Sequence, residues 1–138
     1  MNEYQKMPEW VAKINPLLAE DKFEEANKIT QNYYYSLEDP KDESKFGFLL
    51  IANLIKTNFK YKQYKEALKW CDELLKFNLS KMDKYDDGER EFYTGATYYE
   101  LGDFEKAKEF LTLANKKSKG RSLKLFDDMK YSNFLKEK

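Results

Sequence analysis

The sequence contains no histidine, and this absence excludes several kinds of chemistry. Catalytic triads with an imidazole base, histidine general bases and metal centres with histidine ligands all need that side chain. The single cysteine, Cys71, excludes a disulfide bond within the chain. Cys71 also falls on the apolar stripe of a predicted helix, where a small buried side chain is expected rather than a nucleophile. We therefore expect neither an enzyme nor a protein with a cofactor or metal ion.

A surplus of charge is also missing, since Lys plus Arg and Asp plus Glu both number 25. Nucleic acid is not expected as the main partner, because phosphate binding needs a positive surplus on some face. No apolar run approaches the roughly 20 residues of a membrane span, and the longest, 46–55, is interrupted by Gly47 and Asn53. The residues after Met1 do not resemble a signal peptide. These absences predict a cytoplasmic protein that binds neither nucleic acid nor a membrane.

Glycine and proline are scarce, at 5 and 3 residues, which suits helices joined by short turns. No stretch alternates apolar and polar residues for long enough to form a sheet. A chain of 138 residues is long enough to bury a core of its own. The prediction is an all-α protein with one domain over residues 1–138, and we expect a monomer.

What the chain does contain is an internal repeat. An aromatic residue is followed three positions later by an alanine, at the start of a helical apolar pattern, in three places: Phe23 with Ala26, Tyr64 with Ala67, and Phe104 with Ala107. The copies are 41 and 40 residues apart, and such a near-constant interval predicts a repeat architecture. The alanines should face neighbouring helices, where a small side chain permits close approach.

The apolar spacing predicts seven helices, at about residues 8–20, 23–36, 42 or 44 to 61, 64–77, 84–101, 104–117 and 127–136. Asp42 or Ser44 can cap the third of them. They form three repeats and a capping helix, at about 7–38, 43–79, 84–117 and 122–136. Gly95 lies in the middle of the fifth helix, where glycine costs about 1 kcal/mol relative to alanine, so close contact with a partner helix is expected there. The capping helix should cover the last repeat through Met129, Phe134 and Leu135.

Two charged stretches have an ordinary structural interpretation. The acidic stretch from Asp83 to Glu91 lacks the pattern of a calcium loop, and acidic residues at the start of a helix are the favoured interpretation. The basic stretch from Lys116 to Lys124 could bind a phosphate or an acidic partner, but a solvated turn between helices is favoured.

The third repeat resembles the tetratricopeptide repeat family. The resemblance rests on the spacing of small, aromatic and large apolar residues over twenty positions: Gly95, Tyr98, Gly102, Phe104, Ala107, Leu111 and Ala114. It implies a right-handed solenoid of three antiparallel helix pairs, closed by the C-terminal helix. The interval of 40 or 41 residues exceeds the ~34 of that family, which implies longer helices or loops in each unit.

In that family the first helices of the units line a concave groove that holds a peptide or a partner helix. Matched spacing places in such a groove the candidate partner-binding residues Asn15, Leu18, Lys56, Phe59, Lys60, Phe92, Tyr99 and Glu100. The aromatic residues among them are typical interface anchors. Some relatives clamp a C-terminal carboxylate with cations, but Val11 and Ala52 stand where those cations would be needed, so this clamp is not predicted.

Two functions follow from the resemblance. The first is a non-catalytic module that binds a peptide or protein partner through the concave groove. The alternative is a dedicated inhibitor, such as an immunity protein that neutralises a bacterial toxin by binding it directly. The simplest role for many of the aromatic residues is to fill the core of a small domain.

Overall fold

The computed structural model describes residues 3–124, 126 and 129–136, and within these residues every regular element is helical. The predicted all-α class is therefore confirmed. The elements are seven α-helices and two short 3-10 helices: α1 (Glu3–Ala19), α2 (Phe23–Tyr35), η1 (Lys41–Glu43), α3 (Lys45–Lys60), α4 (Tyr64–Leu75), α5 (Glu89–Glu100), α6 (Phe104–Ser118), η2 (Arg121–Lys124) and α7 (Lys130–Lys136). No helix in the described part of the chain has both the length and the apolar character that a membrane crossing needs.

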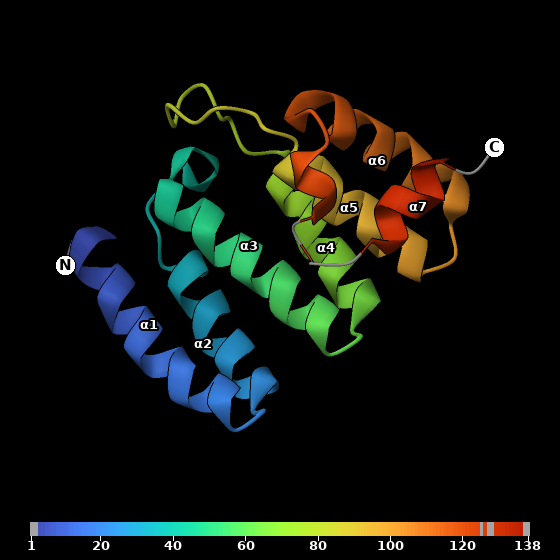
Figure 1. Ribbon diagram of the computed structural model, residues 1–138. Coiled ribbons are helices and arrows are strands. Elements are labelled where there is room, and N and C mark those ends of the chain that lie inside the picture. The colour runs from blue at the N-terminus through green and yellow to red at the C-terminus, as the bar shows by residue number, and fades with distance from the viewer. Residues whose placement is uncertain (1–2, 125, 127–128, 137–138) are drawn as a thin grey trace.

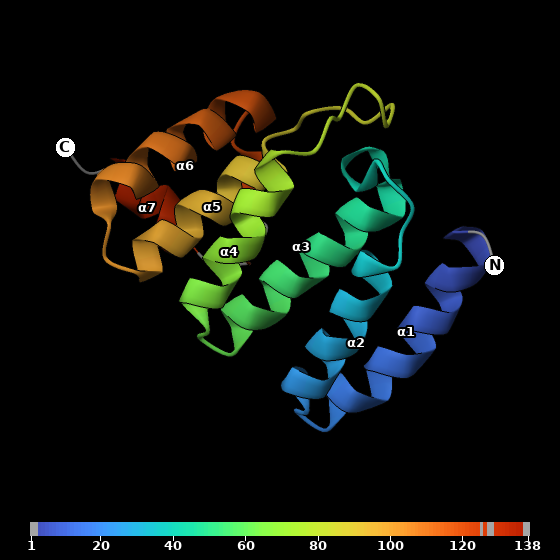
Figure 2. The same ribbon diagram turned by 180° about the vertical axis from the view of Figure 1, so that it is seen from behind.

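Helices α1 to α6 run alternately in opposite directions, and each packs against the next one in the sequence (Figure 1). The view from behind shows the same succession from α1 at one end to α6 at the other (Figure 2). Helix α7 and η2 pack against α6, so the end of the chain returns over the last helix pair.

Helix α3 lies in the middle of this succession and supplies much of the core. Its sequence is apolar nearly all round, and such a helix is expected to be buried. Five of its large side chains have no exposed surface: Phe46, Leu50, Ile51, Leu54 and Ile55. Ser44 caps the helix by accepting a hydrogen bond from the backbone of Gly47 at 2.9 Å.

The repeated alanines lie where a neighbouring helix approaches closely. Ala26, Ala67 and Ala107 are at most 2% exposed, as the repeat pattern predicts. Gly95 has the same role in α5, because a Cβ atom there would lie 2.7 Å from Cγ and 2.9 Å from the backbone nitrogen of Leu111 on α6. The close approach of α5 and α6 therefore depends on the missing side chain.

Three predicted boundaries are wrong. The first helix begins at Glu3 rather than near Pro8. The fifth helix begins at Glu89 rather than near Lys84, because side chains of the preceding turn bind the backbone themselves. Asp86 accepts a hydrogen bond from the Gly88 nitrogen at 3.3 Å, and Asp87 accepts one from the Glu89 nitrogen at 3.1 Å. Gly88 has a positive φ of 85°, which glycine adopts without strain and a helix does not use.

The capping helix is shorter than predicted and is preceded by a separate 3-10 turn. It begins at Lys130, and residues 127 and 128 of the predicted helix lie outside the described part. The turn at the end of α6 is tight, because Lys119 and Gly120 both have positive φ angles, of 55° and 89°. Left-handed residues of this kind end a helix and redirect the chain.

Candidate binding surface

The predicted groove residues lie on α1, α3 and α5 but differ widely in exposure. Asn15, Lys56 and Lys60 are exposed, Leu18, Phe59, Tyr99 and Glu100 are partly buried, and Phe92 has no exposed surface. The expectation that Phe92 is a surface anchor is therefore wrong. The others can still contact a partner, to the extent that the chain's own C-terminal segment leaves them open.

That C-terminal segment covers the aromatic residues of α5. The ring of Phe92 lies edge-on to Tyr131, with ring centroids 5.6 Å apart, and its centroid is 5.1 Å from that of Phe126. Tyr99 contacts Tyr131 and Phe134 in the same way, with centroid distances of 5.5 Å and 5.0 Å. Two predicted anchors thus belong to an internal aromatic cluster.

The same segment reaches α3 and the end of α5. Phe126 stacks on Phe59 with centroids 4.4 Å apart. Glu100 accepts hydrogen bonds from the Lys130 ammonium at 2.6 Å and from the Tyr131 hydroxyl at 3.0 Å. One half of the predicted groove is therefore filled by the chain itself.

The cap works through different residues from those predicted. Met129 is 57% exposed, whereas Tyr131 is 1% exposed, so Tyr131 and not Met129 closes the last helix pair. The expectation for Phe134 holds in part, because it contacts Tyr99 and Phe104 while remaining partly exposed. The apolar residues in 126–136 predict that this segment is buried against the rest of the protein. They do not predict that it lies against α3 and α5.

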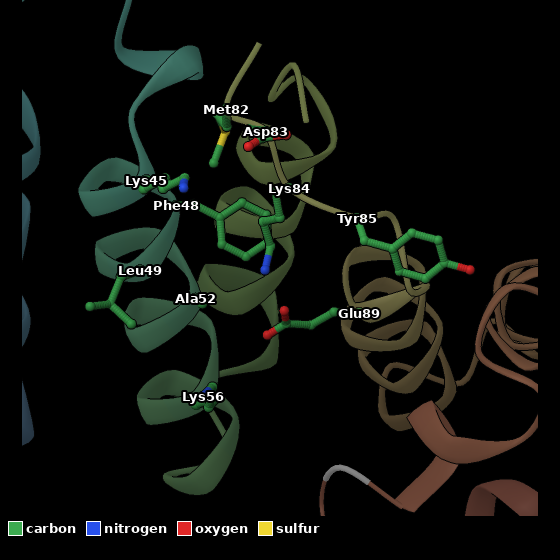
Figure 3. A pocket seen from close by; sticks show the side chains of 10 residues that line it. All are labelled: Lys45, Phe48, Leu49, Ala52, Lys56, Met82, Asp83, Lys84, Tyr85 and Glu89. Atoms are coloured by element: carbon green, nitrogen blue, oxygen red, sulfur yellow. The ribbon is translucent and has the colours of Figure 1, made fainter. Parts of the chain in front are cut away.

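An open cleft of about 610 Å³ lies between α3, the loop before α5, and the start of α5. Its lining residues are Lys45, Phe48, Leu49, Ala52, Lys56, Met82, Asp83, Lys84, Tyr85 and Glu89 (Figure 3). This volume lies in the usual range of ligand pockets. Of the predicted partner-binding residues, the cleft includes Lys56.

The cleft has an apolar floor and apolar edges. Phe48, Ala52 and Met82 are at most 6% exposed and form its buried base. Leu49 and Tyr85 lie at opposite edges in Figure 3, with exposed fractions of 38% and 76%. Large exposed apolar and aromatic side chains next to a hollow are typical of a protein-binding surface.

The charged groups of the cleft are unevenly paired. The Lys84 ammonium lies 4.8 Å from the centroid of the Phe48 ring, a cation–π contact. Glu89 accepts a hydrogen bond from the Tyr93 hydroxyl at 2.5 Å, and burial together with the Glu89 charge raises the pKa of Tyr93, which stays a donor. Among the described residues, Lys45, Lys56 and Lys84 form no ion pair.

The loop that forms one wall is held at both ends by hydrogen bonds. At its start, the Asn78 nitrogen donates to the Asp42 carbonyl at 2.8 Å. At its end, the Arg90 guanidinium donates to the carbonyl oxygens of Leu75 and Phe77 at 3.2 Å and 3.0 Å, which satisfies the end of α4. The wall is therefore a defined structure. The helix prediction extends over it because Tyr85 stands at helical spacing from Phe92, although Asp86-Asp87-Gly88 has the composition of a turn.

A charged network also ties the loop to α6. The Lys117 ammonium donates to Asp86 at 2.7 Å and also to Glu91, whose side chain is 4% exposed. Burial is the largest single influence on the pKa of Asp86 and would raise it, but the hydrogen bonds from Lys117 and the Gly88 nitrogen, together with the charges of Lys117 and Arg90, lower that pKa overall. The network fixes the loop that carries Tyr85.

Lys117→Met is expected to lower the free energy of unfolding by about 3 kcal/mol, because it leaves the buried Glu91 carboxylate with only the longer contact to Arg90, at 4.0 Å. A lowered pKa means that Asp86 stabilises the native state above its unfolded pKa of about 3.9, and that this contribution disappears as the pH falls. The variant should therefore lose less stability than the wild type on acidification. Urea denaturation at neutral and acid pH measures both effects, with the exposed neighbour Lys116→Met as the control. Equal stabilities of the two variants would contradict the prediction.

The described residues bring no three Cys, Asp or Glu side chains together in a way that could hold a metal ion. Cys71 is 1% exposed, and burial raises the pKa of its thiol to about 12. The thiol is therefore protonated at neutral pH, and only the thiolate is a good nucleophile. Cys71 has the small buried role that its position in the helix pattern predicts.

A scan against models of protein families gives no match, and searches of curated proteins and of solved structures give none either.

Proposed function

We propose that the protein is a non-catalytic interaction module that binds a segment of a protein partner in the cleft between α3 and α5. The observation that carries this proposal is the cleft itself, with its buried apolar floor and its exposed edges Leu49 and Tyr85. A neighbouring part of the same surface already holds a peptide segment, since Phe126 and Tyr131 of the C-terminal segment lie against α3 and α5. The surface thus has the form and chemistry to hold a second one.

The proposal includes a tetratricopeptide-like stack of three antiparallel helix pairs, α1 with α2, α3 with α4, and α5 with α6. Two features support it. Each pair places a buried alanine early in its second helix, at Ala26, Ala67 and Ala107, and Gly95 permits the close contact within the third pair. In such a stack α3 and α5 are first helices of adjacent units, which puts the cleft on the concave side. We expect the module to act as a monomer in the cytoplasm.

The test uses short random peptides, displayed on phage and selected against the full-length protein, whose affinities are then measured by calorimetry. Tyr85→Ala should weaken binding by roughly thirtyfold, because truncation of a hot-spot aromatic residue typically costs 2 kcal/mol or more. Leu49→Asp should also weaken it, because it places a charge at the apolar edge. Both side chains are exposed, so neither substitution should unfold the protein.

Matched controls come from exposed residues outside the cleft. Tyr35→Ala and Leu113→Asp make the same chemical changes at side chains that are 58% and 41% exposed, and they should leave the affinity unchanged. Selected peptides that bind all four variants equally well would show that the cleft is not the binding surface.

A dedicated inhibitor of a toxin would use the same cleft to hold one folded partner domain. The two forms of the proposal differ in the length of the bound segment. Short peptides that bind with full affinity support an adaptor, whereas a co-purified partner that loses affinity when cut to its contacting segment supports an inhibitor.

A further inference from the structure

The cleft concentrates positive charge on a chain that has no net charge. Lys45, Lys56 and Lys84 all line it, and none of them forms an ion pair with a described residue. Two carboxylates, Asp83 and Glu89, also line it, and Glu89 accepts a hydrogen bond from the Tyr93 hydroxyl. The lining therefore carries three cations against two anions, a small positive surplus on a chain without net charge.

We propose that the segment bound in the cleft is acidic, with an apolar side chain between its carboxylates. This inference rests on the proposed function and gives the chemistry of the partner. The carboxylates would meet the lysine ammonium groups, and the apolar side chain would lie on Phe48 and Met82. An interface in which opposite charges meet gains specificity and a faster association.

The helical geometry of α3 sets the length of this segment. Lys45 and Lys56 are 11 residues apart, close to three full turns, so they lie on one face of the helix roughly 16 Å apart. An extended peptide spans that distance with about five residues. Lys84 reaches the same space from the opposite wall, over the Phe48 ring (Figure 3). Two or three carboxylates over five or six residues would satisfy all three cations.

The filled half of the surface limits where the segment can lie. Phe126 covers Phe59 one turn beyond Lys56, so a ligand along α3 must end there or turn away. The charges of that filled half are already paired, because Lys130 binds Glu100 at 2.6 Å. Lys130 is thus paired within the protein, whereas the three lysines of the cleft form no ion pair with a described residue.

The experiment is a selection of random displayed peptides against the full-length wild type, followed by affinity measurements on charge-reversed variants. The double variant Lys45→Glu with Lys56→Glu should bind the selected peptides about tenfold more weakly. The control Lys65→Glu with Lys108→Glu makes the same change of net charge at exposed lysines of α4 and α6 and should bind as the wild type does. Peptides selected on the wild type should be rich in Asp and Glu around Leu or Phe, and high salt should weaken their binding.

Each outcome bears on one proposal or the other. Selected peptides that are neutral or basic would overturn the proposal that the bound segment is acidic. So would peptides that bind the Lys45→Glu and Lys56→Glu double variant as tightly as they bind the control variant. If those same peptides still lose affinity with Tyr85→Ala, the cleft remains the binding surface and the proposed function stands. Peptides whose affinity is unchanged both by Tyr85→Ala and by the charge reversal would overturn both proposals.

Discussion

Tyr131→Ala is expected to lower the free energy of unfolding by about 3–5 kcal/mol, the usual cost of removing a large buried aromatic side chain. Tyr131 is 1% exposed although it belongs to the seven-residue helix α7. Its ring lies against Phe92 and Tyr99, and its hydroxyl donates to Glu100. The substitution therefore opens a cavity and uncovers two aromatic rings at once.

The measurement is chemical denaturation of the full-length protein, with Asn133→Ala as the control. Asn133 is exposed on the same short helix, so its replacement should change stability by less than about 0.5 kcal/mol. Tyr131→Phe separates the two contributions, because it keeps the ring and removes the hydrogen bond to Glu100. A Tyr131→Ala variant as stable as the control would mean that the C-terminal segment does not cover α5.

Gly95→Ala is expected to destabilise the protein by about 1–3 kcal/mol, the usual cost of overpacking a tight contact. The sign of this stability change is informative. At an exposed helix position, alanine is favoured over glycine by about 1 kcal/mol, so the same substitution would stabilise the protein there. Here the new Cβ would meet the Leu111 side chain and backbone at less than 3.0 Å. The backbone of α6 cannot move away without disturbing the most extensive helix contact in the molecule.

A larger side chain should overpack the contact more, so Gly95→Leu should lower the free energy of unfolding by more than Gly95→Ala does, as measured by urea denaturation. The control is Thr112→Ala on the exposed face of α6, which should be close to neutral. A gain of stability for Gly95→Ala would show that α5 and α6 are further apart than the structure places them.

The sequence was sufficient to predict most helices and their buried faces. The apolar period of 3.6 places α2, α3, α4 and α6 within two residues of their observed ends. The buried alanines and the role of Gly95 also follow from the sequence, because a small residue in an apolar stripe indicates that a neighbouring helix approaches closely there. These are local properties, which depend on residues three or four positions apart.

The boundary of α5 and the candidate site could not be predicted in the same way. Tyr85 continues the apolar spacing of the helix. The backbone nitrogens of Gly88 and Glu89, however, donate to the side chains of Asp86 and Asp87, and these hydrogen bonds stabilise a turn there instead of a helix. The turn Asp86-Asp87-Gly88 is a recognisable signal for this loop. No comparable signal shows which side of the molecule the C-terminal segment covers, since that depends on the path of the chain after Gly120.

The contact of Phe126 with Phe59 joins residues 67 positions apart, whereas each of the first six helices packs on its sequence neighbour. During synthesis on the ribosome, α1 to α6 can therefore associate as they emerge, through contacts that close short loops. The rings of Phe59 and Phe92 lack the contacts of Phe126 and Tyr131 until those two residues have left the exit tunnel. A nascent chain stalled before that point would expose these aromatic side chains to solvent. Exposed hydrophobic surface of this kind is what chaperones and proteases recognise in incompletely folded proteins.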